Sequence, residues 1–94
     1  MSPYIEQDAR EPIDIVLDQL ESPIVNTIGD VNYILSSICK RWIDGRLWGE
    51  AGLVPSYQDI NEVVGVLECV KQEFYDMVAR PYEDQKRVER GDVY

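Results

Sequence analysis

The sequence predicts an all-α fold: a small protein of three to four helices, the last of them long and kinked or broken at Pro81. Apolar residues recur at intervals of three and four over three segments, capping residues precede two of them, and no stretch alternates strictly enough to require a strand. With 94 residues and 45% apolar content, we expect a single helical domain over residues 1–94 that buries a core. A chain this short removes only about 60–65% of its unfolded surface from water, which favours a dimer or higher homo-oligomer.

The first two helices are separated by a proline break. The first is expected over residues 12–20, because proline suits the first turn of a helix and four apolar residues follow on one stripe, and Ser22-Pro23 ends it. The second opens at Thr27, which forms a variant of the capping box with Asp30, and runs along apolar positions through Trp42 and Ile43. Asp44-Gly45 closes it.

The third helix is predicted to be the longest. Residues 45–55 contain three glycines and a proline beside four apolar residues, which indicates a loop that packs. Ser56, with Asp59 three residues on, then caps a helix whose stripe comprises Ile60, Val63, Val64, Leu67, Val70, Phe74, Met77 and Val78. Pro81 must kink or stop this helix, and a short polar helix over residues 82–90 follows before Gly91. If the long helices of two copies pack together, we expect Phe74, Met77 and Val78 at the seam and Trp48 at its edge.

The composition excludes several functions. Eighteen acids against nine bases give a net charge of −9, which disfavours long nucleic acids and anionic membrane surfaces. The chain has no histidine, so Ser-His-Asp sites, Cys-His pairs and His-ligated zinc are excluded. Two cysteines without CxxC spacing, a polar N-terminus and apolar runs of only three or four residues favour a reduced, cytoplasmic protein. No cofactor is expected.

The charge is unevenly distributed along the chain. Residues 1–39 hold seven acids and one base, and residues 47–79 hold six acids and one base, a net −6 and −5. Most of the cations are concentrated in two islands, Lys40-Arg41-Arg46 and a C-terminal one. The first complements the dipole at the end of the second helix and needs no ligand to explain it. The C-terminal island comprises Arg80, Tyr82, Lys86, Arg87 and Arg90.

This C-terminal island has two interpretations. Its guanidinium groups suit a phosphate and its tyrosine suits stacking on a base, as in a site for a small anionic nucleotide. Alternatively, its cations neutralise Glu83, Asp84, Glu89 and Asp92, or the acidic face of a neighbouring subunit. Two further features favour ordinary packing: Trp42 is most simply a core residue, and Trp48 packs locally or anchors an interface.

Two acidic pairs on the third helix raise a different possibility. Asp59 with Glu62, and Glu73 with Asp76, each lie on one face and resemble the pairs that hold magnesium in helical nucleotide pyrophosphatases. The pairs are fourteen residues apart, about 21 Å along a helix, which is too far for one metal cluster. A solvated acidic face explains them more simply. Neither Cys39 nor Cys69 has a base that would make it a nucleophile.

Several phrases of the sequence occur together in a recognisable order: Pro3-Tyr4-Ile5, Gly29-Asp30-Val31-Asn32-Tyr33, Gly65-Val66-Leu67-Glu68-Cys69, Glu73-Phe74-Tyr75, Pro81-Tyr82-Glu83-Asp84-Gln85-Lys86 and Gly91-Asp92-Val93-Tyr94. The set resembles an uncharacterised family of roughly hundred-residue proteins encoded by bacteriophages, prophages and bacteria. The match is strongest over residues 61–94, and the loop 44–56 departs from the family pattern.

The resemblance implies a phage-type accessory protein that acts against host defence in the host cytoplasm. We expect a non-enzymatic oligomeric sponge that sequesters a signalling nucleotide at the C-terminal island. The alternative is an acidic inhibitor that docks on a basic surface of a host defence effector, mimicking nucleic acid or acting like an anti-CRISPR protein. A magnesium-dependent nucleotide pyrophosphatase is a distant third.

Overall fold

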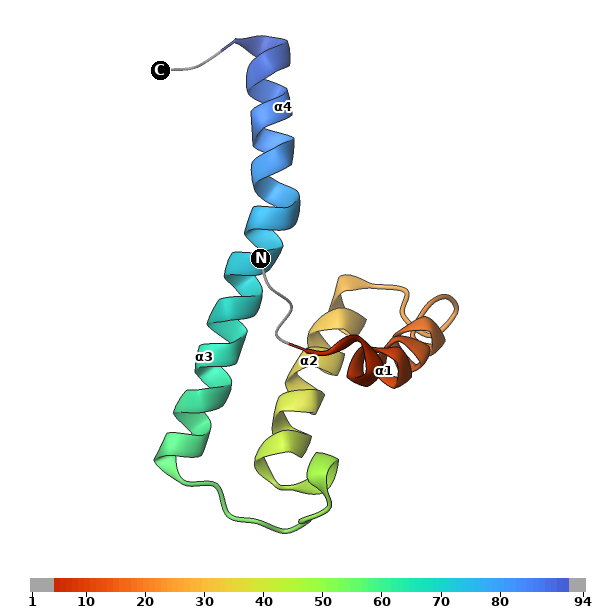
Figure 1. The fold of residues 1–94 in the computed structure, drawn as a ribbon, viewed down its shortest axis with the longest axis vertical. Helices are drawn as coiled ribbons and strands as arrows, with labels where there is room; N and C mark the ends of the chain where they lie inside the picture. Colours follow the sequence, from red (N-terminus) through yellow and green to blue (C-terminus); the bar gives the residue numbers. More distant parts are fainter. Residues whose placement is uncertain (1–4, 92–94) are drawn as a thin grey trace. The chain divides into compact units, whose positions relative to one another are not determined.

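The all-α prediction is confirmed for the part of the chain that the computed structural model describes, residues 5–91 (Figure 1). The helices are α1 (Gln7–Gln19), α2 (Ile28–Ile43), α3 (Tyr57–Phe74) and α4 (Arg80–Arg90), with a 3₁₀ turn η1 (Arg46–Trp48) and a π-helical segment η2 (Tyr75–Ala79). No strand occurs over these residues. Parts of two quoted motifs, Pro3-Tyr4 and Asp92-Val93-Tyr94, lie outside the described residues.

The chain divides into two units, residues 1–38 and residues 39–94. The first contains α1, a turn and most of α2, and the second contains the end of α2, the loop with η1, and the long helix formed by α3, η2 and α4. The prediction of a single domain over residues 1–94 stays a prediction.

The start of the first helix was predicted wrongly. It begins at Gln7, five residues before Pro12, which lies inside it. Residues 7–11, QDARE, are mostly strong helix formers. Pro12 removes one hydrogen bond, to the carbonyl of Asp8, but that residue is exposed, so water can bond its carbonyl instead. The propensity of the preceding residues therefore outweighs the preference of proline for the first turn.

Both capping interactions predicted for the later helices are present. The hydroxyl of Thr27 accepts from the backbone N–H of Asp30 at 3.1 Å, and the Asp30 carboxylate accepts from the N–H groups of Thr27 and Asn26 at 3.0 and 2.9 Å. Ser56 and Asp59 form a complete capping box, with distances of 2.9 and 3.1 Å. These bonds satisfy backbone donors that a helix start leaves without partners.

Gly45 ends α2 with a conformation that only glycine suits. Its φ is 85°, and its N–H donates to the carbonyl of Trp42 at 3.1 Å. A Cβ at this position would lie 1.9 Å from the carbonyl oxygen of Glu50, whose own N–H donates back to the Gly45 carbonyl at 2.8 Å. The chain therefore turns sharply where the sequence predicts the end of this helix.

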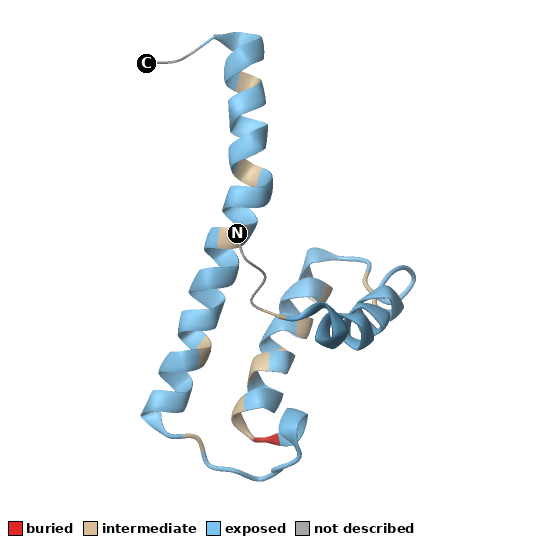
Figure 2. Ribbon diagram, in the orientation of Figure 1, coloured by how far each residue is buried: buried red, intermediate tan, exposed pale blue. Residues whose placement is uncertain are grey.

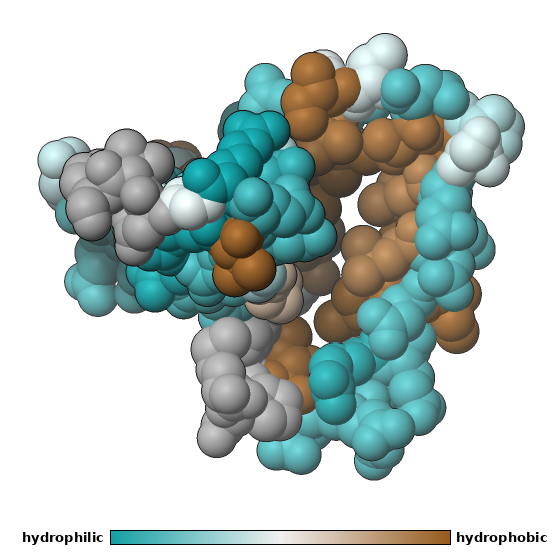
Figure 3. Space-filling model, turned by 90° about the horizontal axis from the view of Figure 1, so that it is seen from above, coloured by the Kyte–Doolittle hydropathy of each residue, from teal (hydrophilic) through white to brown (hydrophobic). Residues whose placement is uncertain are grey.

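The expectation of a buried core is wrong for the described residues. No apolar side chain among them is buried, and the burial map is almost uniformly exposed (Figure 2). Trp42, expected in the core, is 50% exposed. The reason lies within the units. Helices α1, α2 and α3 each have an apolar side, and hydrophobic side chains are visible at the surface in Figure 3, because neither unit has enough helices to cover them.

Candidate functional site

The interruption predicted at Pro81 takes the form of a widened turn. Proline has no N–H to donate to the carbonyl of Met77 four residues earlier, and its ring crowds that carbonyl. The chain responds upstream: the N–H of Arg80 bonds to the carbonyl of Tyr75, five residues back, as in a π-helix. Helical structure then continues to Arg90, so residues 57–90 form a long helix of about 34 residues.

The five residues of the predicted C-terminal island all lie on α4. At 100° per residue, Arg80, Tyr82, Lys86, Arg87 and Arg90 fall within an arc of about 160°, on one half of the helix. All except Lys86, which is half-buried, are exposed. We call this surface the basic face of α4.

Three cations of the basic face pair with carboxylates of the long helix, one in η2 and two in α4. The guanidinium of Arg80 lies 3.1 Å from Asp76, and the ammonium of Lys86 lies 3.4 Å from Glu89. Arg87 pairs with Asp84. The interpretation that these cations neutralise neighbouring acids is therefore met for Asp84 and Glu89. Glu83 has another role, and Asp92 lies outside the described residues. Exposed pairs of this kind contribute only about 0–1 kcal/mol, so an anion with better geometry can replace them.

Two aromatic rings accompany the cations. The guanidinium carbon of Arg80 lies 5.8 Å from the centre of the Tyr75 ring, and the ammonium of Lys86 lies 5.5 Å from that of Tyr82. Both distances are within the range of cation–π attraction. The hydroxyl of Tyr75 donates to Glu83 at 2.9 Å, and this bond to a carboxylate raises the pKa of Tyr75.

Sequence reasoning missed Tyr75 as a member of this site. The available signal was Pro81: because it forces a π turn over residues 75–79, it alters which residues of the preceding turn lie near Arg80. A ring five residues before a cation is displaced by about 140° in a regular α-helix but by much less in a π turn. The site therefore comprises the basic face of α4 together with Tyr75.

The four predicted interface residues lie on two segments, Trp48 on η1 and the other three on the long helix, and the seam between two copies stays a prediction. Phe74, Met77 and Val78 follow one another at helical spacing and are 59%, 67% and 50% exposed. Trp48 instead packs against Trp42, with ring centres 6.0 Å apart, and its indole N–H donates to the Trp42 carbonyl at 3.0 Å. Local packing thus accounts for Trp48 in this structure.

The predicted acidic pairs of α3 serve different local roles. Asp59 caps the helix, and the N–H and hydroxyl of Ser56 lower the pKa of its carboxyl. Asp76 pairs with Arg80. Within residues 5–91, no three His, Cys, Asp or Glu side chains are grouped so as to hold a metal ion. In the same range, no helix is both long and apolar enough to cross a membrane.

The first unit contains a hollow that sequence reasoning also missed. Its volume is about 370 Å³. It is lined by side chains of α1, the following turn and α2, all of them apolar except the carboxylate of Glu21. The lining residues are Leu17, Leu20, Glu21, Val25, Val31, Ile34, Leu35 and Ile38. The signal was present in the two apolar stripes on either side of Ser22-Pro23, which a short turn brings to face each other. Its apolar lining does not suit a phosphate.

A comparison with protein families agrees with the expectation of an uncharacterised family. Residues 1–93 match the family model described as Domain of unknown function (DUF6899). The chain belongs to this family. No curated protein and no solved structure matches it. The family spans both units, so the basic face of α4 and the hollow of the first unit both lie within one family domain.

Proposed function

We propose that this DUF6899 chain is a non-enzymatic binding protein that works as a homo-oligomer and sequesters a small anionic nucleotide on the basic face of α4. Arg80, Lys86, Arg87 and Arg90 would bind the phosphates, and the Tyr82 ring would stack on a base. In a phage or prophage, such a protein would remove a signalling nucleotide of host defence. The proposal includes no chemical step, because sequestration needs only affinity.

The observation that supports this proposal best is the pairing of cations with rings along one helix. Arg80 with Tyr75 and Lys86 with Tyr82 repeat the same arrangement about two turns apart. A nucleotide offers the matching groups, a phosphate for a cation and a base for a ring. A phosphate can also accept hydrogen bonds from two N–H groups of one guanidinium in parallel, a geometry that the ammonium of lysine does not offer.

A melting-shift screen with cyclic di- and trinucleotides tests the proposal. At a ligand concentration a hundred times the Kd, binding adds about 2.7 kcal/mol. For a domain of this size that corresponds to a Tm increase of about 10–20 °C. We expect Arg80→Ala and Arg87→Ala to abolish the increase. Lys40→Ala, which removes an exposed cation from α2, is the matched control and should retain it. No shift with any nucleotide would refute the proposal.

Turnover assays separate this function from hydrolysis. With Mg²⁺ or Mn²⁺ present, the bound nucleotide should be recovered intact, and Glu73→Gln should behave as the unaltered protein does. Hydrolysis that depends on Glu73 would instead support the pyrophosphatase alternative, because Glu73 belongs to one of its two acidic pairs.

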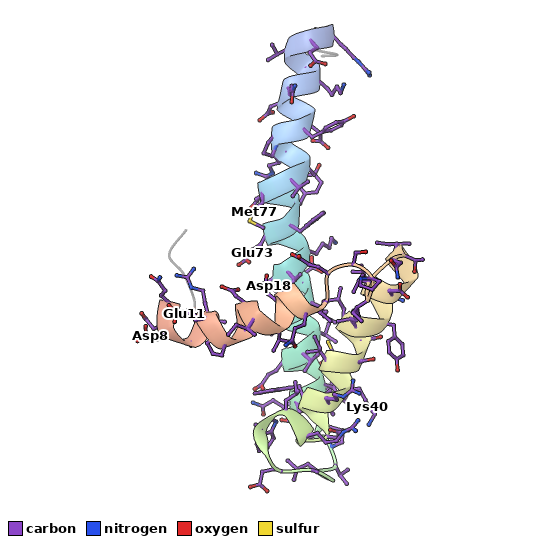
Figure 4. The ribbon with its side chains drawn as sticks, turned by 90° about the vertical axis from the view of Figure 1, so that its right-hand side faces the viewer. Asp8, Glu11, Asp18, Lys40, Glu73 and Met77 are labelled. Carbon is purple, nitrogen blue, oxygen red and sulfur yellow. The ribbon has the colours of Figure 1, made fainter. Side chains whose placement is uncertain are left out.

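A second function, docking on a basic surface of a host defence effector, is favoured by α1. Asp8, Glu11, Asp14 and Asp18 fall within about 120° of this helix, opposite the apolar stripe, and all four are exposed. Figure 4 labels Asp8, Glu11 and Asp18 on α1. With Arg10 as the only base between Gln7 and Gln19, α1 carries four acids and one base, a net −3. A pull-down from host lysate at low salt tests this. Loss of a captured effector in Asp14→Lys and Asp18→Lys would support docking, and recovery of the bait alone would refute it.

A further inference from the structure

The long helix has an apolar stripe that no described residue of its own unit covers. Ile60 and Leu67 are each 41% exposed, and Phe74 is 59% exposed. These three residues are seven apart, and Val63 and Val70 lie between them with the same period. Two such series, offset by three, are the a and d positions of a coiled-coil heptad. The stripe therefore has the pattern of a seam for another helix.

This stripe lies on α3 and ends at the π turn. Its last members, Met77 and Val78, belong to η2 and are both exposed. Between Arg80 and Arg90, Val88 is the only valine, leucine, isoleucine, methionine or phenylalanine. A helix that covers the stripe must therefore lie along α3, because α4 has no apolar side with which to extend the seam.

The apolar sides of the first unit already face each other. Both line the hollow described above, through Leu17 and Leu20 of α1 and through Val31, Ile34, Leu35 and Ile38 of α2. Each of these helices has a single apolar stripe, so neither has a second one to offer α3. Residues 5–38 also hold seven acids and one base, a net −6, which would oppose the net −3 that four acids and one base give α3. The helix that matches the stripe is α3 of another copy.

We propose that α3 pairs with α3 of a second copy in antiparallel orientation, about a two-fold axis that passes between Leu67 and Val70. This rests on the homo-oligomer of the proposed function and gives it an interface. The stripe of each copy then covers the same stripe of the other, so that every a residue faces a d residue. The facing pairs are Val63 with Phe74, Leu67 with Val70 and, at the edge, Ile60 with Met77.

Packing favours this orientation over a parallel one. A parallel pair in register places each residue opposite its own copy, so a layer of two Phe74 rings would adjoin a layer of two Val70 side chains. In the antiparallel pair each layer combines a larger with a smaller side chain, which keeps the width of the seam even. A parallel pair would also set the two α4 helices side by side, although they have no apolar sides to pack.

Charge favours the same orientation. Glu62 and Glu68 occupy heptad positions c and b, which lie away from the seam, whereas Asp59 and Glu73 lie beside it. In a parallel pair each of these acids is level with its own copy. In the antiparallel pair the two Asp59 residues are offset along the axis by about 28 Å and the two Glu73 residues by about 14 Å. Both offsets exceed the screening length of about 8–10 Å at physiological salt, so repulsion between the copies is weaker.

The antiparallel pair leaves the basic face of α4 available. Residue 57 of one copy lies opposite residue 80 of the other, so residues 81–90 extend beyond the start of the partner's α3. Tyr82, Lys86, Arg87 and Arg90 therefore take no part in the seam. The two basic faces extend from opposite ends of the pair, and each copy would bind its own nucleotide.

A distance between spin labels tests the orientation in the full chain. In a background of Cys39→Ser and Cys69→Ser, Tyr57→Cys places one label at the start of α3, where the side chain is 79% exposed. The antiparallel pair separates the two labels by about 35 Å along the axis, because residue 57 lies 11.5 residues from the two-fold. A parallel pair keeps them within about 20 Å, since helix axes pack about 8–10 Å apart. Cys69, which is exposed, carries the control label in Cys39→Ser and should give a short distance in either orientation.

Each outcome decides the proposal. A long distance at position 57 with a short one at position 69 supports it. Short distances at both positions mean a parallel pair, long distances at both mean a contact elsewhere, and no dipolar coupling at either means that no second copy covers the stripe. Each of these three results overturns the proposal. Failure here is distinguishable from failure of the nucleotide proposal, because the melting-shift screen reports on α4 whatever the orientation of α3.

A carboxylate placed in the seam gives an independent check. Val70→Asp puts a charge into the central layers, and we expect the dimer Kd measured by light scattering to rise at least tenfold. Val88→Asp is the matched control, because it makes the same change on the same long helix beyond the pair, and it should leave the Kd within about twofold. Equal Kd values for the two variants would place the contact outside the stripe and overturn the proposal. If circular dichroism shows that Val70→Asp loses helix, the spin-label distances decide alone, because those variants leave the stripe intact.

Discussion

Pro81 is the residue whose replacement tests the physical account of the long helix most directly. It lies inside a helical segment that runs from Tyr57 to Arg90, and the chain accommodates it by a π turn over residues 75–79. If the missing N–H and the bulk of the ring cause that turn, Pro81→Ala should restore a regular α-helix. The backbone N–H that alanine supplies at this position would then bond to the carbonyl of Met77.

The size of the effect follows from the cost of proline. Proline in a regular helix interior costs about 3 kcal/mol or more relative to alanine. The π turn relieves part of the steric clash, so we expect Pro81→Ala to stabilise the protein by about 1–3 kcal/mol. For a domain of this length, about 2 kcal/mol corresponds to a Tm increase of about 8–16 °C.

Thermal melting followed by circular dichroism at a fixed protein concentration measures this effect. Gln85→Ala is the matched control, because it substitutes alanine on the same helix for a residue that already favours helix, and its Tm should change by no more than about 3 °C. A Tm for Pro81→Ala that is unchanged or lower than that of the original chain would refute the reasoning. The π turn would then have to be attributed to contacts of η2 rather than to the proline.

Three further predictions concern the caps and the tryptophans. Ser56→Ala removes the acceptor for the N–H of Asp59, so it should lower the free energy of unfolding measured by chemical denaturation by about 1 kcal/mol. The control is Ser36→Ala, because the hydroxyl of Ser36 only donates back to a helix carbonyl; it should change the free energy of unfolding by less than about 0.5 kcal/mol. Hydrogen bonds lower the pKa values of Asp30 and Asp59 in the folded chain. The stabilisation that these two carboxylates give is therefore fully present above their unfolded pKa of 3.8, and it is lost as the pH falls through their folded pKa values. The double variant Asp30→Asn with Asp59→Asn should flatten the acid limb of a plot of unfolding free energy against pH. Trp48→Ala should remove a near-ultraviolet dichroism band that arises from the tilted pair of indoles, and an unchanged spectrum would contradict their contact.

Features that depend on neighbouring residues could be predicted from the sequence. The reciprocal bonds of Thr27 with Asp30, and of Ser56 with Asp59, follow from the side-chain types and a spacing of three, and both are present. The end of α2 at Gly45 follows from the same kind of local rule. The start of α1 could not be predicted as well, because the preference of proline for a first turn competes with the helix propensity of the residues before it.

Burial was the feature that the sequence predicted least well. Helical periodicity identifies which side of a helix is apolar, but it does not say whether the same chain covers that side. Trp42 illustrates the point: its place on the stripe of α2 is as predicted, yet half of its surface is exposed and its contact is with Trp48. Apolar content alone therefore predicts the capacity to bury surface, and the partner has to be identified separately.

For the candidate site, too, the sequence predicts the residues but not the partners that they contact. Its five residues on α4 could be predicted from their types and clustering, and helical spacing places them on one half of the helix. Their partners could not, because each cation has several carboxylates within three or four residues, and the choice of Asp76, Asp84 and Glu89 depends on side-chain geometry. Tyr75 joins the site only through the π turn.

The near-neutral charge of α4 determines how an anion would bind there. With four bases and three acids between Arg80 and Arg90, the basic face produces little field at a distance. Affinity for a nucleotide must therefore come from short-range geometry, that is, from two parallel N–H groups of a guanidinium and from the face of a ring, and this affinity should depend weakly on salt. Docking through α1, which carries a net −3 over Gln7–Gln19, would instead rely on long-range attraction and weaken steeply as salt is added. Salt dependence consequently distinguishes the two proposed functions even before the ligand or the effector is identified.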